Sequence, residues 1–440
     1  MVAELEALGQ AVLAWARSHR NSSLAEHEQG ILDQLRAAAP GLLASALTTA
    51  TTTLDARQPR LPEACPECGT RTRGHGWRTR QVLTRCGVLP LNRPWYYCAA
   101  CERGWSPTDR TLGIDQGRLS LGVQAWLGDL AAGQTFRETV GLLRELTGLV
   151  VSAETVRRLT EDRGTAQAEA QSATAAAVQE RHAPVEPVTL PDGDLTIEVD
   201  GVMVRYVDGW HEVKLGVVGG VRAGALSAKS YVAARADPAT FGPLLVAEAA
   251  RRGALDIVDR DVTDLASPAL ARLRPVTVIA DGAPWIWNLA AEHFGDRTEI
   301  VDLFHVAEHL WAVAQALEPA DARAQAAWAQ ARVAELRDQG PGPVQAALRQ
   351  AHPRTDEARE VVRRARGYVA TNAGRMDYPS YRAQGLPLGS GAVESSAKSV
   401  VQLRMKRPGM RWSDRGARAI LTLRTQRLTR LEAADQPTAA

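Results

Sequence analysis

The sequence is poor in cysteine and has no long apolar segment, and each shortage excludes a class of protein. Five cysteines among 440 residues, an odd number with two Cys-x-x-Cys pairs, favour metal binding over a set of disulfides. No run reaches the ~18 uninterrupted apolar residues that a membrane helix needs. Near the start, Glu4 and Glu6 occur without a cationic segment, so no secretory signal is expected. We therefore expect a cytoplasmic, nucleoid-associated protein that does not contact a membrane.

Low-complexity composition and nucleotide-binding motifs are also missing. The chain has 36 glycines and 23 prolines in 440 residues, well below the share of ~25–30% that marks low-complexity chains. A fibrous protein or a disordered scaffold is thereby excluded. No Walker motif and no dinucleotide-binding glycine fingerprint occurs, so ATP and NAD chemistry have no support.

Charge is segregated along the chain, although the net charge is only +2. Residues 57–110 carry ten arginines and four acids, and residues 398–430 carry ten basic residues and one acid. Residues 180–302 carry 19 acids and 12 bases. An acidic middle between basic ends is typical of a polyanion-binding protein with a central carboxylate site, whereas any one run alone could be a solvated face.

Residue periodicity predicts a multidomain α/β protein. Apolar residues at helical spacing indicate helices in 1–56, and residues 63–110 show short alternating stretches with little core of their own. Helices are expected at 119–132, 135–146 and 153–162, the last with Ser152 as N-cap. The predicted segments are a helical region (1–58), a zinc ribbon (59–112), helix-turn-helix-like helices (113–182), a linker (183–194), a catalytic core (195–430) and a disordered tail (431–440).

The period changes from 3.6 to 2 at residue 195. Strands are predicted at 195–207, 210–218 and 227–234, with the first hairpin turn at Asp208-Gly209. Alternating helices and strands follow at 238–252, 276–280, 284–293 and 298–303. Three antiparallel strands followed by this alternation give the order of an RNase H-like fold, a mixed sheet with helices on both faces.

Two aspartates end apolar runs that are expected to be strands. Asp200 ends Ile-Glu-Val-Asp, Asp281 ends Val-Ile-Ala-Asp, and glycine follows each. A carboxylate on a core strand is costly unless it is paired or binds a metal. Each Asp-Gly alone is better explained as a turn, but the two together favour a cation site at neighbouring strand ends. Glu394 enters as a third acid, or simply complements a helix dipole.

Three carboxylate ligands suit Mg²⁺ or Mn²⁺ better than Zn²⁺. Two such cations per active site can activate a water or a 3′-hydroxyl for phosphodiester chemistry.

These residues resemble a known family. Asp200, Asp281 and Glu394 are similar to the DDE triad of bacterial insertion-sequence transposases, whose core is RNase H-like. The segment Asp302-Leu-Phe-His305 looks like the D-x-x-H element of the Mutator-related branch. Two further segments resemble the Kra-type branch of these transposases: Gly389-Ser-Gly-Ala-Val-Glu394 and Arg404-x-Lys406-x-x-Gly409-Met-Arg411-Trp412.

The resemblance covers about residues 60–428 and implies an all-α insertion at about 306–372. It also implies that His305 belongs to the active site, where it could contact the scissile phosphate. Asp302 and His305 lie three residues apart at a helix start, so they face one side. An N-cap aspartate with a packed histidine explains the same pair equally well.

Four cysteines predict a structural zinc site. Cys65, Cys68, Cys98 and Cys101 form two Cys-x-x-Cys pairs, as a closed tetrahedral Zn²⁺ requires. The 29 residues between the pairs exceed the usual ~15–20, which indicates an enlarged β-hairpin. A redox role is the alternative, and Cys86 is expected to be a free thiol.

Candidate DNA contacts come from three segments. The predicted ribbon offers Arg78 and Arg80, and the expected reading helix offers Arg157 and Arg158. The basic C-terminal segment offers Arg404, Lys406, Arg411 and Trp412. A solvated face and a structural helical hairpin are the respective alternatives.

The sequence therefore favours a transposase that binds element-end and target double-stranded DNA, as a homodimer in the complex. It would hydrolyse a phosphodiester and then use the freed 3′-OH for strand transfer. The alternatives are a non-catalytic DNA-binding regulator derived from such an enzyme and an RNase H-like nuclease. Intact carboxylates argue against the regulator, and the number of DNA-binding segments argues against the nuclease.

Overall fold

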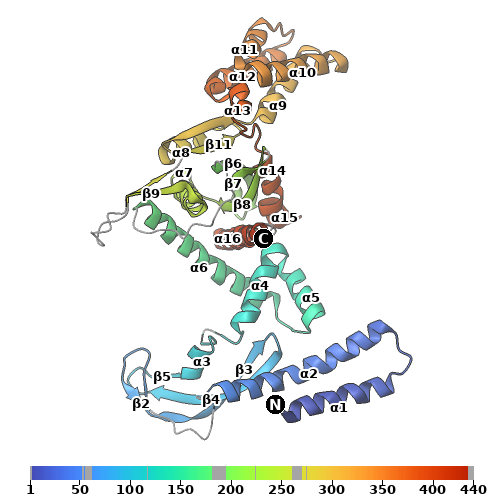
Figure 1. Cartoon of the computed structure of the whole chain (residues 1–440), viewed down its shortest axis with the longest axis vertical. Helices are drawn as coiled ribbons and strands as arrows, with labels where there is room; N and C mark the ends of the chain where they lie inside the picture. The colour runs from blue at the N-terminus through green and yellow to red at the C-terminus, as the bar shows by residue number, and fades with distance from the viewer. Residues whose placement is uncertain are drawn as a thin grey trace. The chain divides into compact units, whose positions relative to one another are not determined.

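The computed structural model describes residues 2–51, 54, 62–115, 117–180, 195–222, 224–259, 270–273 and 275–434 (Figure 1). The protein is mixed α/β and forms two compact units, Met1–Leu159 and Thr160–Ala440. The predicted linker at 183–194 and residues 435–440 of the predicted tail lie outside the described residues. Residues 431–434 of that tail are helical, because the last helix continues to Ala434.

The first unit begins with two helices, α1 (Val2–Ser18) and α2 (Leu24–Ala50). Ser23 starts α2 through a capping box, in which its hydroxyl and the Glu26 carboxylate each accept a backbone N–H. The helices predicted in 1–56 are therefore present. No helix in the described ranges is both long and apolar enough to traverse a bilayer.

A β-rich segment follows, dominated by one long hairpin. Its strands are β1 (Glu63–Ala64), β2 (Arg71–Thr72), β3 (Gly74–Thr84), β4 (Gly87–Cys98) and β5 (Arg103–Trp105). β3 and β4 pair antiparallel, so the long insert between the cysteine pairs is the enlarged hairpin that its length indicated. The segment does have a core: Val82, Leu89 and Leu91 pack with Leu54 and Ile114, and with Leu43 and Leu47 of α2. This shared core corrects the expectation of a core-poor ribbon.

Four helices complete the passage to the second unit: α3 (Pro107–Thr111), α4 (Leu121–Gly133), α5 (Phe136–Thr147) and α6 (Ala153–Gln179). Ser120 and Thr135 cap α4 and α5, and Gly148 ends α5 with φ 74°. The Ser152 hydroxyl accepts the Thr155 N–H at 3.0 Å, as predicted. However, α6 is 27 residues long and continues well beyond the predicted end at 162.

The second unit is built on a five-stranded mixed sheet in the order β12-β11-β6-β7-β8. Its strands are β6 (Leu195–Tyr206), β7 (Gly209–Arg222), β8 (Ala225–Ala234), β11 (Val276–Ala280) and β12 (Arg297–Val301). β6, β7 and β8 pair antiparallel, whereas β11 pairs parallel with both β6 and β12. The turn at Asp208-Gly209 joins β6 to β7, as predicted. A further hairpin, β9 (Leu255–Asp259) with β10 (Leu270–Leu273), was not predicted.

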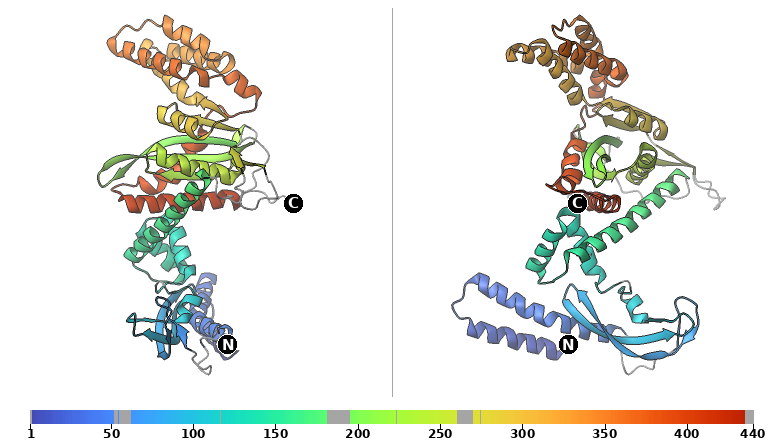
Figure 2. Two further views of the ribbon diagram at one scale, coloured as in Figure 1. Left: turned by 90° about the vertical axis from the view of Figure 1, so that its left-hand side faces the viewer. Right: turned by 180° about the vertical axis from the view of Figure 1, so that it is seen from behind.

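Helices cover both faces of this sheet (Figures 1 and 2). On one face, Ile197 and Val199 pack with residues of α7 (Pro238–Ala249) and α8 (Pro284–His293). The other face contacts α14 (Gly391–Ser396) and α16 (Asp414–Ala434), which are joined through a π-helical segment (Ala397–Gln402) and α15 (Leu403–Met405).

The stretch between β12 and α14 is helical, as predicted for residues 306–372. It comprises α9 (Leu303–Leu317), α10 (Ala322–Gln339), α11 (Pro341–Gln350), α12 (Asp356–Asn372) and α13 (Tyr378–Ala383). The break at Gly340 has φ 79°, a left-handed conformation that favours glycine. α9 packs against both α10 and α12, so the inserted helices form their own layer beside the sheet (Figure 2).

The close packing of α6 on α16 predicts opposite stability effects of alanine at two helical glycines. A Cβ on Gly164 of α6 would lie 2.5 Å from the Ala419 Cα of α16, whereas Gly367 in α12 faces open space. We expect Gly164→Ala to destabilise the protein by about 1–3 kcal/mol through overpacking. Gly367→Ala should instead stabilise it by about 0.5–1 kcal/mol, since alanine favours a helix interior. Urea unfolding measures both, and equal effects at the two positions would contradict the close packing of α6 on α16.

Candidate active site and thiol cluster

Asp200 lies in the middle of β6, beside the point where the parallel strand β11 ends and Asp281 follows it. The expectation that Asp200 ends a strand was therefore wrong, because β6 continues to Tyr206. β6 and β11 are parallel, and their register pairs Val199 with Ala280, so the next residue of each strand is an aspartate. Both side chains are partly exposed. The pKa of Asp200 is raised, chiefly because burial disfavours the charged form, and also because the Asp281 carboxylate lies nearby. The structure thus brings two of the three predicted acids together, as the topology required.

The turn that carries Asp281 is held from the inserted helices. The Asp281 carboxylate accepts the Ala283 N–H at 2.9 Å, and the Tyr368 hydroxyl of α12 donates to the Asp281 carbonyl at 2.6 Å. Gly282 has φ 97°, and a Cβ there would lie 2.9 Å from the Tyr368 ring. Only glycine fits this position, because the conformation is left-handed and the tyrosine fills the space.

His305 lies in α9, where its Nδ1 is 3.5 Å from a Glu308 carboxylate oxygen. A minor electrostatic effect of His305 lowers the pKa of Asp200. The ring also packs at 5.8 Å from the Tyr368 ring and 5.2 Å from the His309 ring, measured between centroids. Burial lowers the pKa of His309, and the neighbouring His305 adds to this. His305 therefore packs on Tyr368, the residue that holds the Asp281 turn, and its role at the active-site rim stays a prediction.

Asp302 is the N-cap of α9. Its Oδ1 accepts the Phe304 N–H at 2.7 Å, which confirms the alternative interpretation of this residue. Its Oδ2 accepts both the N–H of Ser390 at 3.1 Å and the Ser390 hydroxyl at 2.5 Å. Asp302 thus joins the start of α9 to the segment just before α14.

Glu394 is the one predicted acid that does not join the others. It lies in α14 with 71% of its side chain exposed, and it pairs with Lys398 at 2.8 Å. Over the described ranges, the four-cysteine cluster is the one group of three or more such side chains close enough to share a metal ion. The predicted carboxylate triad is therefore not assembled here, and a lysine neutralises Glu394 instead.

Two further acids near Asp200 escaped the sequence analysis. Glu198 lies two residues before Asp200 on the same face of β6, is 2% exposed and accepts the Val393 N–H at 2.7 Å. Burial raises the pKa of Glu198 to about 7. Glu212 reaches from β7 over Gly201 and pairs with Lys214 at 2.6 Å. The signal for Glu198 was present in the sequence, since strand alternation puts residues 198 and 200 on one face.

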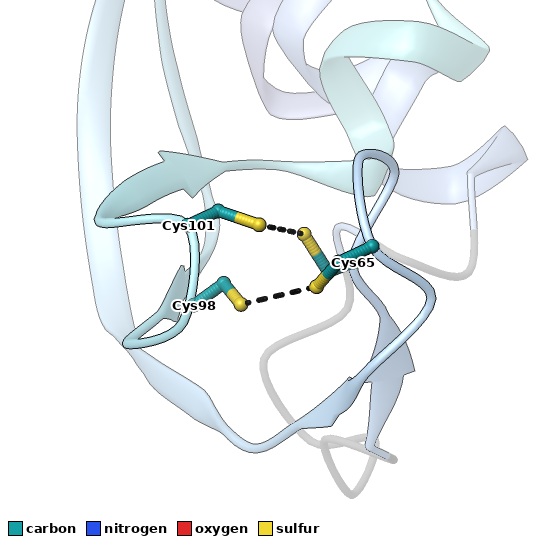
Figure 3. A group of neighbouring side chains, drawn as sticks. Cys65, Cys98 and Cys101 are labelled. Carbon is teal, nitrogen blue, oxygen red and sulfur yellow. Dashed lines mark hydrogen bonds between the residues drawn. The ribbon is translucent and has the colours of Figure 1, made fainter.

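The four predicted cysteines form one cluster, with their sulfur atoms all within 4.8 Å of one another (Figure 3). The Cys65–Cys101 and Cys68–Cys98 sulfur distances are 3.9 and 3.7 Å. Tetrahedral Zn²⁺ with Zn–S bonds of ~2.3 Å requires sulfur separations of about 3.8 Å. Hydrogen bonding to Thr70 lowers the pKa of Cys68 to about 6, whereas the hydrogen bond with Cys68 raises the pKa of Cys101 to about 12. The donor set therefore fits a structural metal ion such as Zn²⁺, and Cys86 is outside it.

Two arginines of the predicted ribbon form ion pairs within the fold, which the sequence did not predict. Arg80 pairs with the buried Asp109 at 2.8 Å and donates to the Gly117 carbonyl, and Arg93 pairs with the same carboxylate at 2.5 Å. An ion pair within the fold thus occupies Arg80, which corrects its assignment as a DNA contact. Arg78 is exposed and its guanidinium lies 4.6 Å from the Trp95 ring centroid.

Arg404 and Trp412 are structural rather than exposed. Arg404 is 1% exposed, and its guanidinium lies 5.0 Å from the Trp412 ring centroid. Trp412 is buried, donates from Nε1 to the Met405 carbonyl at 3.0 Å, and accepts the Val207 N–H with its own carbonyl. Both assignments as DNA contacts are therefore corrected, because burial excludes a phosphate. Lys406 and Arg411 are exposed, as a contact requires.

The predicted reading helix presents its two arginines differently. Arg157 pairs with Glu154 at 2.6 Å on the surface of α6, and Arg158 is exposed. A surface pair of this kind contributes only about 0–1 kcal/mol, so Arg157 can exchange its partner for a phosphate or a base.

No family model matches the chain, and a comparison with curated proteins found no match.

The thiol cluster predicts one bound zinc ion per chain. Cys98→Ser leaves three thiolates for a four-coordinate ion, so we expect about one zinc per wild-type chain and its loss in the variant. Elemental analysis of purified protein measures this. Cys86→Ser is the matched control and should keep its zinc. A fully folded wild type that contains no metal would contradict the assignment.

Proposed function

We propose that the protein is a DDE transposase that cleaves element-end DNA and transfers the freed strand to target DNA. The observation that carries the proposal is the parallel pairing of β6 with β11, which puts Asp200 next to Asp281. The sheet order β12-β11-β6-β7-β8, with helices on both faces, supports an RNase H-like core. The helices α9–α12 between Asp281 and Glu394 agree with the insertion that the family resemblance implies.

Asp200 and Asp281 would hold the divalent cations, because a pair of carboxylates is suited to Mg²⁺ or Mn²⁺. When bound, two such ions activate a water or 3′-hydroxyl and stabilise the leaving oxygen. The like charge of Asp281 contributes to the raised pKa of Asp200, and a bound cation would offset this repulsion.

Glu394 is the proposed third ligand. Its present partner Lys398 is itself largely exposed, and such surface ion pairs contribute only about 0–1 kcal/mol. Breaking the Glu394–Lys398 ion pair to bind a metal ion would therefore cost little free energy. The family resemblance also assigns His305 to the active-site rim, where its ring would donate a hydrogen bond to the scissile phosphate.

One observation favours a non-catalytic DNA-binding regulator, namely that Glu394 stands apart from the two aspartates. Against it, a pure binder gains nothing from two adjacent carboxylates, since like charges at one site are unfavourable without a cation.

Loss of one carboxylate should abolish cleavage and spare binding. Asp200→Asn keeps the side-chain shape but removes a charge from the proposed metal site, so strand cleavage of duplexes carrying the element ends should vanish. Gel analysis of cleavage and fluorescence titration of binding measure the two properties. Asp208→Asn, the same change at the exposed hairpin turn that follows β6, should leave both unchanged. Cleavage that persists in Asp200→Asn would overturn the proposal, and a wild type that binds without cleaving would favour the regulator.

The exposed cations predict two kinds of DNA-binding loss. Lys406→Ala or Arg411→Ala should weaken binding to all sequences alike and flatten the log–log salt dependence by about 0.9 per phosphate contact. Arg158→Ala should instead cost about 1–3 kcal/mol on element ends only, because base-edge contacts carry specificity.

Titrations of element-end and random duplexes at several salt concentrations separate the two effects. Arg363→Ala, which removes an exposed cation of α12, is the control and should leave the salt dependence unchanged. A sequence-specific loss in Arg411→Ala together with a pure salt effect in Arg158→Ala would show that the two roles are reversed.

A further inference from the structure

The start of α14 is tied to the sheet by two carboxylates that are distant in sequence. Glu198 of β6 accepts the Val393 N–H at 2.7 Å, across 195 residues of chain. Asp302 accepts the N–H of Ser390 at 3.1 Å and its hydroxyl at 2.5 Å. The Leu303 N–H also donates to the Leu388 carbonyl at 2.9 Å. The segment that leads into α14 is therefore fixed at several points.

Burial of the Glu198 carboxyl is energetically unfavourable. Glu198 is 2% exposed and lies between Ile197 and Val199, which are 0% and 1% exposed. A buried carboxyl without a partner is strongly unfavourable, whereas the first backbone N–H groups of a helix lack acceptors inside the helix. The Glu198 carboxyl satisfies N–H groups of Ala392 and Val393, so each group supplies what the other needs.

This contact connects the two halves of the proposed active site. Glu198 lies two residues before Asp200, and Val393 lies one residue before Glu394. We propose that Glu198 is a positioning residue, whose carboxyl fixes the first turn of α14 on β6 and thereby sets where Glu394 stands relative to Asp200. The consequence for cleavage rests on the proposed function, whereas the structural consequence for α14 does not.

The contact needs an acceptor oxygen rather than a charge. Glutamine keeps a carbonyl oxygen that can accept the Val393 N–H, whereas leucine removes the acceptor and threonine is too short to reach. Thr196 gives the matched control. It lies on the same face of β6, is 0% exposed, and its hydroxyl makes no hydrogen bond within the described part of the chain. Thr196→Val therefore removes a buried polar group from the same strand and face without removing a hydrogen bond to α14.

Two measurements on the full-length protein test the proposal. Hydrogen–deuterium exchange of the peptide covering residues 388–396 should speed up at least about tenfold in Glu198→Leu and Glu198→Thr. Cleavage of element-end DNA at saturating DNA should fall by about tenfold or more in the same variants, with the Kd for DNA unchanged. Glu198→Gln should restore both to within about threefold of wild type, and Thr196→Val should match wild type. Because threonine is tolerated two residues earlier in the strand, Glu198→Thr serves if Glu198→Leu does not fold.

Wild-type exchange and cleavage in Glu198→Leu or Glu198→Thr would overturn the proposal. A folded Glu198→Gln that loses as much as Glu198→Leu would also overturn it, because charge rather than the acceptor would then matter. If the wild type does not cleave DNA, the proposed function fails, and the exchange data alone judge the positioning role.

Discussion

The parallel pairing of β6 with β11 is the constraint on which the candidate site depends. It places Asp200 of β6 beside Asp281, which follows β11, and the two like charges raise the free energy of the ionised site. The surrounding polar contacts then reach this site from distant segments. Tyr368 holds the Asp281 turn, and Glu198 and Asp302 hold the approach to α14. The helical insertion and the C-terminal helices thereby both contact the part of the sheet that carries Asp200 and Asp281.

Much of this arrangement could be predicted from local pattern. Period-2 alternation and the Asp208-Gly209 turn predicted the β6–β7 hairpin. The apolar runs before Asp200 and Asp281 predicted two neighbouring strands, although Asp200 lies within β6 rather than at its end. The Cys-x-x-Cys spacing predicted the thiol cluster, because two short chelating turns can reach one ion whatever lies between them. Helix caps such as Ser152 were also predictable, because their hydrogen bonds join residues only three positions apart.

What could not be predicted depends on contacts between distant residues. Arg404 and Trp412 lie in a basic segment that is typical of a phosphate-binding surface, yet both are buried against each other. Arg80 was predicted to contact DNA, because its ion-pair partner Asp109 lies 29 residues away and no local pattern connects the two. Whether Glu394 reaches Asp200 also depends on tertiary packing, and its side chain is 71% exposed and pairs with Lys398 instead. Local pattern predicts which residues are charged, whereas tertiary packing decides which of them solvent or a ligand can reach.

The central claim is that Asp200 and Asp281 share divalent cations, and anomalous X-ray scattering from Mn²⁺ tests it most directly. Crystals of the protein with an element-end duplex, grown with Mn²⁺ in place of Mg²⁺, should show a strong anomalous peak in contact with carboxylate oxygens of both aspartates, at about 2.1–2.2 Å. A Glu394 oxygen in the same coordination shell would complete the proposed ligand set. Ordered DNA with no manganese at Asp200 and Asp281, at a concentration that supports cleavage, would contradict the account.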